Sequence, residues 1–337
     1  MKQILIIKLG AIGDVLRTTS ILKPLKNKHV PCFITWVTKK ESFGLLENNS
    51  LIDKLAEIND KSLLKKKYYL VISLDDDYEA CELASKLKKE KLIGSYLDKN
   101  RNKTYTKSSA SWFDMGLLGG PDRDDLKNVN KRTYQSILFE ILGLKDRDEG
   151  PKLILTKKDL EFEDKFAKKH GIKKEDSVIG INTGAGERWE LKRLNEEKTI
   201  ELINELNKET KAKLILLGGP EEKERNKRIL SKVKNKIIDA GCNNSLREFS
   251  SIVNLCDLII TSDSLALHIA LALKKKVVVF FGPTSANEIE LYGLGKKVLP
   301  AREFLCFYKK KCIHKRDCGD LIEVNDIIIA TKVLLKK

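Results

Sequence analysis

The sequence predicts an α/β protein with two doubly wound domains, each a parallel sheet covered by helices on both faces. Short β-branched runs alternate with amphipathic stretches along the chain, as in strand–helix–strand units. A length of 337 residues exceeds one ordinary domain and suits two. Because 42% of the residues are hydrophobic, two cores can be buried.

In the first half, apolar runs predict strands at residues 4–8, 32–37 and 70–74. Residues 14–25 and 79–89 have the spacing of amphipathic helices, and a further helix over 131–142 ends at Gly143. Residues 145–176 are charged and contain Gly150-Pro151, so we expect the domain boundary there. The expected N-terminal domain covers residues 1–160.

In the second half, the pattern is more regular. Strands are predicted at residues 178–182, 213–217, 236–239, 258–261 and 277–281, with helices at 196–208, 221–233, 246–255 and 265–273. This alternation is typical of a Rossmann-like domain, expected over residues 170–320. A last helix is predicted over residues 324–335. The C-terminal segment that contains it, residues 321–337, can pack back on the first domain.

Both halves begin with a buried strand that runs into a glycine-containing turn. The two segments read ILIIKLGAIG (4–13) and VIGINTGAG (178–186). In open α/β sheets, ligands bind outside the carboxyl ends of the strands. Two Rossmann-like domains that face each other across a cleft would therefore form an interdomain site.

Several classes of enzyme are excluded because their motifs are missing. The sequence has four histidines and contains no HExxH, GxSxG, GxxxxGK[ST] or GxGxxG motif. The missing motifs disfavour zinc peptidases, serine hydrolases with a nucleophile elbow, P-loop kinases and dinucleotide-binding enzymes with the glycine fingerprint. Catalysis is expected to depend on carboxylates, lysines and helix ends.

The net charge of +16 is distributed unevenly. Residues 1–50 hold eight basic and three acidic side chains and residues 301–337 hold nine and five, so the two ends carry +9 of the total. This excess is either a solvated lysine-rich surface or an attraction to a phosphorylated substrate or an anionic membrane face. Without a zinc finger, an aromatic RNP-like strand or an Arg-rich arm, nucleic acid is not an expected partner.

The first turn places Asp14 after Gly10 and Gly13. Asp14 is either the N-cap of the next helix or a general base for an acceptor hydroxyl. Around it, Lys8, Gly13 and Arg17 are candidate acceptor-side residues.

Two later turns are candidate phosphate sites. Thr183, Gly184 and Lys192 suit a diphosphate, although an ordinary loop with a solvated basic pair fits as well. In the third turn Asp263 or Ser264 should cap a helix, and His268 is either a packing residue or a leaving-group contact.

Two further clusters resemble metal sites. Asp75-Asp76-Asp77 is similar to a DxD clamp, but acidic residues are common at strand ends. Cys306, Cys312 and Cys318 with His314 are spaced more widely than zinc ligands usually are, so reduced cysteines are favoured. We therefore predict no metal.

Taken together, the turns resemble glycosyltransferase family 9, the ADP-heptose:lipopolysaccharide heptosyltransferases and their relatives. The matching segments are K-L-G-A-I-G-D (8–14), T-G-A-G-E-R-W-E-L-K-R (183–193), L-G-G-P-E-E (217–222), S-D-S-L-A-L-H (262–268) and F-G-P-T (281–284). The resemblance implies a GT-B fold and inverting, metal-independent transfer from a nucleotide sugar, ADP-linked heptose or a relative, without a cofactor. The implied acceptor is an anionic glycolipid of the lipid A and inner-core type.

The resemblance also implies roles for individual residues. Asp14 matches the proposed base, and Thr183 and Lys192 match residues that hold the diphosphate. Glu222 matches an acidic residue that contacts the ribose. Asp263 and His268 match the donor site, to which Gly184 and Ser264 also belong. The sequence departs from the family at Leu265, where many members have Gly, and at Leu194-Asn195, where Trp-Pro is usual.

Two other functions remain open at this stage. One is an inactive module that binds a sugar nucleotide or a glycolipid. The other is a Rossmann-type epimerase or oxidoreductase, which would need a glycine fingerprint and a Tyr/Lys or His pair that the sequence does not show. With seven cysteines and no apolar run of membrane-spanning length, we expect a cytoplasmic protein, with peripheral contact at the inner membrane face as an option.

Overall fold

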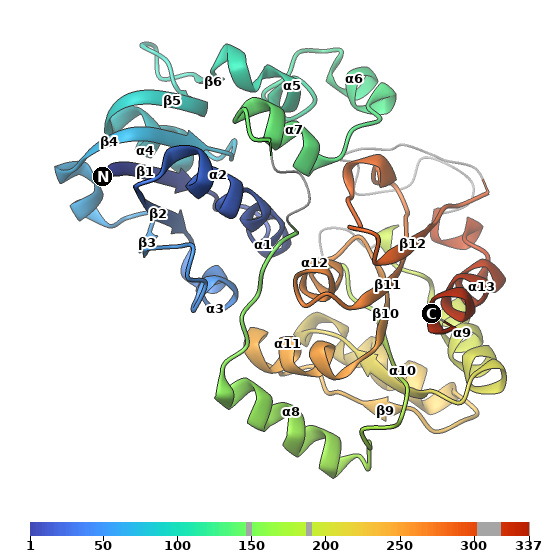
Figure 1. The fold of residues 1–337 in the computed structure, drawn as a ribbon. Helices are drawn as coiled ribbons and strands as arrows, with labels where there is room; N and C mark the ends of the chain where they lie inside the picture. The colour runs from blue at the N-terminus through green and yellow to red at the C-terminus, as the bar shows by residue number, and fades with distance from the viewer. Residues whose placement is uncertain (146–149, 187–190, 302–317, 337) are drawn as a thin grey trace. The chain divides into compact units, whose positions relative to one another are not determined.

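The computed structural model describes residues 1–145, 150–186, 191–301 and 318–336 (Figure 1). The chain forms two compact units. The first comprises residues 1–154 and 287–290, and the second comprises 155–286 and 291–337. None of the helices in the described ranges has the length and apolar character that a bilayer crossing requires.

The first unit is built on a six-stranded sheet of order β3-β2-β1-β4-β5-β6. Every neighbouring pair is parallel except β5 and β6. The strands are β1 (Lys2–Ile7), β2 (Cys32–Thr38), β3 (Lys54–Glu57), β4 (Lys67–Ser73), β5 (Lys88–Leu97) and β6 (Lys103–Tyr105). Parallel pairing brings the carboxyl ends of β1, β2 and β4 to one edge, where the first candidate turn begins.

Alternate residues of the central strands face two separate cores. Ile4 and Ile6 pack with α1 (Ile12–Thr18), α2 (Leu22–His29) and α7 (Tyr134–Ile141). Leu5 and Ile7 face the opposite side, where α4 (Tyr78–Lys86) covers the sheet. Burial on both faces explains the nearly continuous apolar run of β1. Short helices α3 (Phe43–Leu46), α5 (Ala110–Phe113) and α6 (Arg123–Val129) complete the unit.

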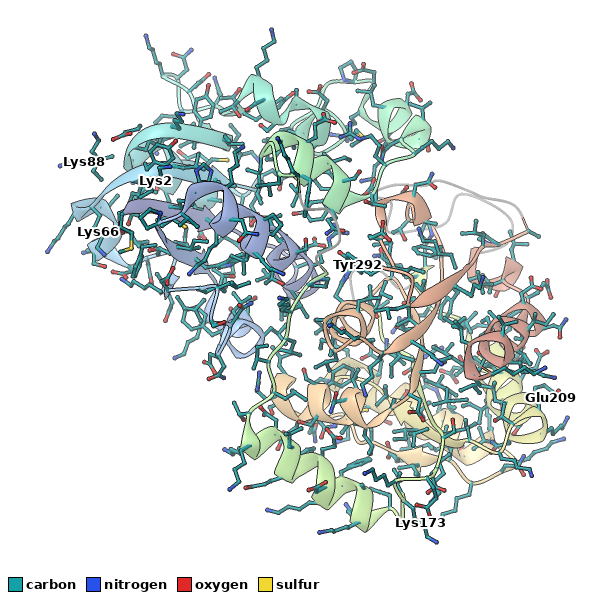
Figure 2. The ribbon with its side chains drawn as sticks, in the orientation of Figure 1. Lys2, Lys66, Lys88, Lys173, Glu209 and Tyr292 are labelled. Carbon is teal, nitrogen blue, oxygen red and sulfur yellow. The ribbon has the colours of Figure 1, made fainter. Side chains whose placement is uncertain are left out.

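Lysines mark the opposite, amino edge of this sheet (Figure 2). Lys2, Lys66 and Lys88 lie at or next to the starts of β1, β4 and β5, and the register places Lys67 opposite Lys88. Part of the excess positive charge therefore lies on the surface at the amino edge of the sheet, away from the candidate turn. A strand that opens with four charged residues also explains why the sequence suggested a helix over 79–89, whereas α4 ends at Lys86 and β5 begins at Lys88.

The second unit contains a fully parallel six-stranded sheet of order β12-β11-β10-β7-β8-β9. Its strands are β7 (Val178–Asn182), β8 (Lys213–Leu217), β9 (Ile238–Asp239), β10 (Leu258–Ser262), β11 (Lys276–Phe280) and β12 (Gly295–Val298). The two sheets confirm the predicted α/β class. The sequence did not indicate the short strands β3, β6 and β12, nor β5.

Helices cover both faces of this sheet. On one face α9 (Glu196–Glu209), α10 (Lys223–Lys232) and α13 (Val324–Leu335) share a core with the strands. α12 (Leu265–Ala272) packs against β10 and β11, α11 (Leu246–Leu255) lies beside α12, and α8 (Lys157–Lys169) packs on α11. Capping boxes at Thr156 and Ser245 start α8 and α11.

The units divide between residues 154 and 155, inside the charged segment 145–176 where the boundary is expected, and residues 157–169 of that segment form α8. The C-terminal helix was expected to return to the first domain. Instead, Ile327, Ile328 and Leu334 of α13 belong to the core of the second unit.

Candidate active-site residues

Asp14 lies at the carboxyl edge of the first sheet, in the first turn of α1. The N-cap of α1 is Ala11, and no side chain caps the helix, so the alternative that Asp14 is the N-cap is wrong. Its carboxylate is 2.9 Å from the Arg17 Nε and its side chain is 35% exposed. The carboxylate is therefore accessible from solvent.

The backbone around Asp14 is held from the helix side. The Thr18 hydroxyl donates to the Asp14 carbonyl at 2.6 Å and contacts the Tyr134 hydroxyl at 2.9 Å. The Arg17 guanidinium lies 4.0 Å from the centre of the Tyr134 ring. Because Tyr134 is buried, the pKa of its phenol is raised, and it remains a neutral platform beneath Arg17.

Lys8 and Gly13, two further acceptor-side candidates, are buried. The Lys8 ammonium lies 2.6 Å from the Asp75 Oδ1 and donates to the Leu74 carbonyl at 3.3 Å. Burial opposes the charge of Lys8, but the Asp75 carboxylate together with Tyr134 and Asp14 outweighs burial, so the pKa of Lys8 is raised. In this structure Lys8 supports the turn.

Asp75 belongs to the acidic cluster that resembles a metal clamp, but its contacts are with the protein. Its Oδ2 accepts from the backbone N–H groups of Leu9 and Gly10. Burial raises the pKa of Asp76. Among the described residues, no three His, Cys, Asp or Glu side chains are grouped as metal ligands. Cys306, Cys312 and His314 lie outside the described residues, as does the side chain of Cys318.

At the carboxyl edge of the second sheet, Lys192, Asp263 and His268 lie together. The Lys192 ammonium is 2.9 Å from the Asp263 Oδ2 and 3.2 Å from the Asp263 carbonyl oxygen. The His268 Nε2 is 3.9 Å from the second carboxylate oxygen of Asp263, Oδ1. Three residues predicted from two separate sequence segments thus form one largely buried polar group.

Thr183 and Ser264 are tied to this edge by their hydroxyls. Thr183 Oγ1 donates to Asn226 Oδ1 at 2.6 Å, and Ser264 Oγ contacts Thr261 Oγ1 at 2.8 Å. Ser264 is the N-cap residue of α12, although its side chain does not bond to the helix. Each hydroxyl therefore has a protein partner that a ligand would have to share.

Asn182, which the sequence analysis missed, joins the turns at this edge. Its side-chain amide donates to the Gly184 carbonyl, to Thr261 and to Ser264, at 2.9, 3.0 and 3.2 Å. The available signal was a polar residue at the end of an otherwise apolar, fully buried strand.

Glu222 lies beneath the turn that contains Gly184. A Cβ on Gly184 would come within 2.8 Å of the Glu222 Oε2, so a larger residue at this position would displace the carboxylate. Glu222 accepts from the Gly219 N–H at 2.9 Å, and the Arg193 guanidinium is 3.8 Å from its Oε1. Burial raises the pKa of the Glu222 carboxyl.

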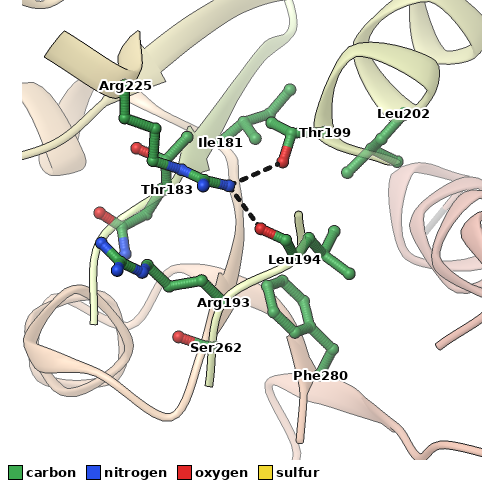
Figure 3. A pocket seen from close by; sticks show the side chains of 10 residues that line it. Ile181, Thr183, Arg193, Leu194, Thr199, Leu202, Arg225, Ser262 and Phe280 are labelled. Atoms are coloured by element: carbon green, nitrogen blue, oxygen red, sulfur yellow. Dashed lines mark hydrogen bonds between the residues drawn. The ribbon is translucent and has the colours of Figure 1, made fainter. Parts of the chain in front are cut away.

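Two arginines line a cavity of about 10 Å³ under the ends of β7 and β10 (Figure 3). Arg225 donates to the Leu194 carbonyl and, at 3.5 Å, to the Thr199 hydroxyl. It thereby holds the segment that follows Lys192. Arg193 and Arg225 were not predicted, because basic residues near a loop are usually solvated.

Most of the chain matches a family of known proteins. A model of glycosyltransferase family 9 (heptosyltransferase) matches residues 59–317. The chain is 26% identical to lipopolysaccharide heptosyltransferase 1 of Campylobacter coli over 357 aligned positions, covering 98% of each chain. The match to the family model confirms the resemblance noted in the sequence, although Asp14 precedes the matched residues.

Solved structures show the same fold. A family 9 glycosyl transferase from Veillonella parvula is 21% identical with a TM-score of 0.78, covering 99% of this chain and 97% of that one. The E. coli ADP-heptose LPS heptosyltransferase II is 17% identical with a TM-score of 0.70, covering 100% and 99%. A more distant similarity, 14% identical with a TM-score of 0.59 over 99% and 76%, is to the E. coli glycosyltransferase TibC, described as iron-containing.

Proposed function

Because the chain belongs to glycosyltransferase family 9, we propose that it moves a heptose or a related sugar from an ADP-linked donor to an inner-core saccharide of lipopolysaccharide. The names of the Campylobacter and E. coli relatives support this donor and pathway. The observation that carries the proposal is the group of Lys192, Asp263 and His268, which lies within the family match.

The second unit is the donor side in this proposal. Lys192 binds the diphosphate, for which it exchanges part of its contact with Asp263. Asp263 then accepts from hydroxyls of the sugar, and Glu222 accepts from the ribose. Gly184 leaves room for the nucleotide beside Glu222, while Thr183, Ser264 and His268 complete the phosphate edge.

In the reaction, Asp14 removes the proton of the acceptor hydroxyl. The hydroxyl oxygen forms a bond to the anomeric carbon from the face opposite the diphosphate, which inverts that centre. The bond from the anomeric carbon to the phosphate oxygen breaks, and ADP leaves with the electron pair. Lys192 stabilises the negative charge that grows on the diphosphate, so this mechanism requires no metal ion.

For the acceptor, we propose an anionic glycolipid at the inner face of the cytoplasmic membrane. Arg17, 15% exposed beside Asp14, is suited to an acidic saccharide, whereas Lys8 and Gly13 support the turn. The basic excess of residues 1–50 and 301–337 supports peripheral attraction to such a surface. Equal binding to neutral and anionic lipid vesicles would contradict this part of the proposal.

A thermal-shift panel with ADP, GDP, UDP, CMP and NAD, with and without Mg²⁺, tests the donor. A ligand at 100 times its Kd should add about 2.7 kcal/mol, a shift of roughly 2–4 °C. We expect selective stabilisation by ADP that Mg²⁺ does not change. Preference for GDP or UDP would keep the transferase and change the donor, and a response to NAD alone would favour an oxidoreductase.

Asp14→Asn separates an enzyme from an inactive binding module. The variant should lose turnover by about 10²–10⁴-fold, because the acceptor proton has no base, while ADP still produces the wild-type thermal shift. Asp125→Asn, at an exposed position of α6, is the matched control and should turn over normally. Normal turnover of Asp14→Asn would refute the assignment of the base.

A further inference from the structure

Asp75 links the end of β4 to the turn that carries Asp14. One carboxylate oxygen accepts from the N–H groups of Leu9 and Gly10, and the other lies 2.6 Å from the Lys8 ammonium. The side chains of Lys8 and Asp75 are 8% and 7% exposed. Three successive residues of the turn are therefore bound by one buried side chain.

The structure of the turn depends on this close approach. A Cβ on Gly10 would lie 2.9 Å from the Asp75 Oδ1, so glycine at this position lets the carboxylate reach the backbone. The backbone of Asp75 is fixed as well, because its carbonyl accepts from Ser95, whose hydroxyl also contacts Ser73 at 2.9 Å. We call the contacts of Asp75 with Lys8, Leu9 and Gly10 the clamp. Through Ser95 the clamp is anchored in β5.

The clamp acts directly on the start of α1. One residue after Gly10, the Ala11 carbonyl accepts from the N–H groups of Asp14 and Val15, at 2.7 and 3.1 Å. The position of Ala11 therefore sets the position of the Asp14 backbone. Any change in the turn is passed to the carboxylate that the proposed reaction uses as its base.

We propose that Asp75 is a positioning residue for Asp14, and that it also neutralises the charge of Lys8 beside that base. This inference rests on the proposed role of Asp14. Among the described residues, the charged and titratable groups that interact with Asp14 include Arg17 on its own helix, Lys8 after β1 and Tyr134 on α7, and Asp75 reaches this set through its ion pair with Lys8. Asp14 is among the groups that raise the pKa of Lys8, so the two side chains interact electrostatically.

The test compares Asp75→Asn, Lys8→Met and the double variant. Asp75→Asn leaves the Lys8 charge uncompensated, which should lower the pKa of Asp14. Lys8→Met leaves the Asp75 charge, which should raise it by a similar amount, and the double variant should return near the wild-type value. A titration followed by NMR of ¹³C-labelled Asp carboxyls, with the Asp14 signal assigned through Asp14→Asn, measures these shifts without an activity assay.

Kinetics provide the second readout. Asp75→Asn should reduce kcat about 10–100-fold with the KM for the donor nearly unchanged, because the base is displaced while the donor side is intact. The acid limb of the pH profile should shift down in Asp75→Asn and up in Lys8→Met. A purely structural clamp would not produce shifts of opposite sign.

Asp60→Asn is the matched control, since Asp60 also binds a lysine, Lys54, and a backbone N–H in the first unit. It should change neither the pKa of Asp14 nor kcat. If Asp75→Asn does not fold, Lys8→Met still tests the charge balance and Gly10→Ala tests the clamp. An Asp14 pKa that moves in the same direction in both single variants, or not at all, would overturn the inference. A wild-type protein without transferase activity but with the opposite shifts would refute the proposed function alone.

Discussion

Two carboxylates lie against glycines at the two sheet edges, and their hydrogen bonding differs. Asp75 approaches Gly10 and receives two backbone N–H groups and the Lys8 ammonium. Glu222 approaches Gly184 and receives the Gly219 N–H, while its Oε1 has no hydrogen-bond partner among the described residues and Arg193 remains 3.8 Å away.

The difference indicates what each carboxylate does. A buried carboxylate with three donors stabilises the fold, whereas one with an unused acceptor is costly until a ligand donates to it. Burial has raised the pKa of Glu222, as expected for such a site. Similar glycine–carboxylate contacts therefore serve as a structural clamp in the first unit and as a candidate ligand contact in the second.

The largest effect on stability should come from removing the charge of the clamp. We expect Asp75→Asn to lower the free energy of unfolding by about 3 kcal/mol at pH 7, because Lys8 remains buried without its counter-charge. Glu222→Gln should change it by less than about 1 kcal/mol. Urea denaturation followed by circular dichroism measures both. Equal losses of unfolding free energy in Asp75→Asn and Glu222→Gln would contradict the distinction between a structural clamp and a ligand contact.

A smaller effect should appear in nucleotide binding. Glu222→Gln should weaken ADP binding about tenfold, because a hydrogen bond from the ribose to a charged acceptor is replaced by a neutral one. Calorimetric titration measures the Kd. Glu224→Gln, at an exposed position of α10, is the control and should bind ADP as the wild type does. Unchanged affinity in Glu222→Gln would assign this carboxylate to the fold instead.

The smallest effect concerns pH. Because the pKa of Glu222 is raised in the folded state, the native protein holds this proton more tightly than the unfolded chain, and stability from this group rises as pH falls through the folded pKa. Glu222→Gln removes this titratable carboxyl, so residue 222 stays neutral at every pH. The unfolding free energy of this variant should therefore exceed that of the wild type above the folded pKa, by less than about 1 kcal/mol, and the difference should disappear below the unfolded pKa. Urea midpoints from pH 4 to pH 8 test the sign.

Much of the fold was predictable because the central strands are buried on both faces. Apolar runs such as β1, β7 and β10 leave little alternative in a parallel sheet. The missed elements lack this signal. β5 opens with four charged residues that lie at an edge of the sheet, and β3 and β12 are four-residue edge strands that contain lysine.

The candidate site was predictable in its parts more than in its contacts. Lys192, Asp263 and His268 follow recognisable turns, and the structure brings them together. The role of Asp75 was not predictable, because it depends on β4 pairing beside β1, and an acidic triplet alone resembles a metal clamp. Likewise, Asn182 gains its meaning only where the ends of β7 and β10 are neighbours.

The position of β1 in its sheet also has a consequence for the order of assembly. β1 lies between β2 and β4, so during synthesis it gains a first neighbour early and its second only after residue 73 has emerged. The side chain that fastens the turn after β1 follows 66 residues behind Leu9. A nascent chain that has not reached Asp75 thus lacks the contacts that hold the turn before Asp14. The geometry of the turn that carries Asp14 accordingly depends on a contact of long sequence separation, which local formation of α1 cannot replace.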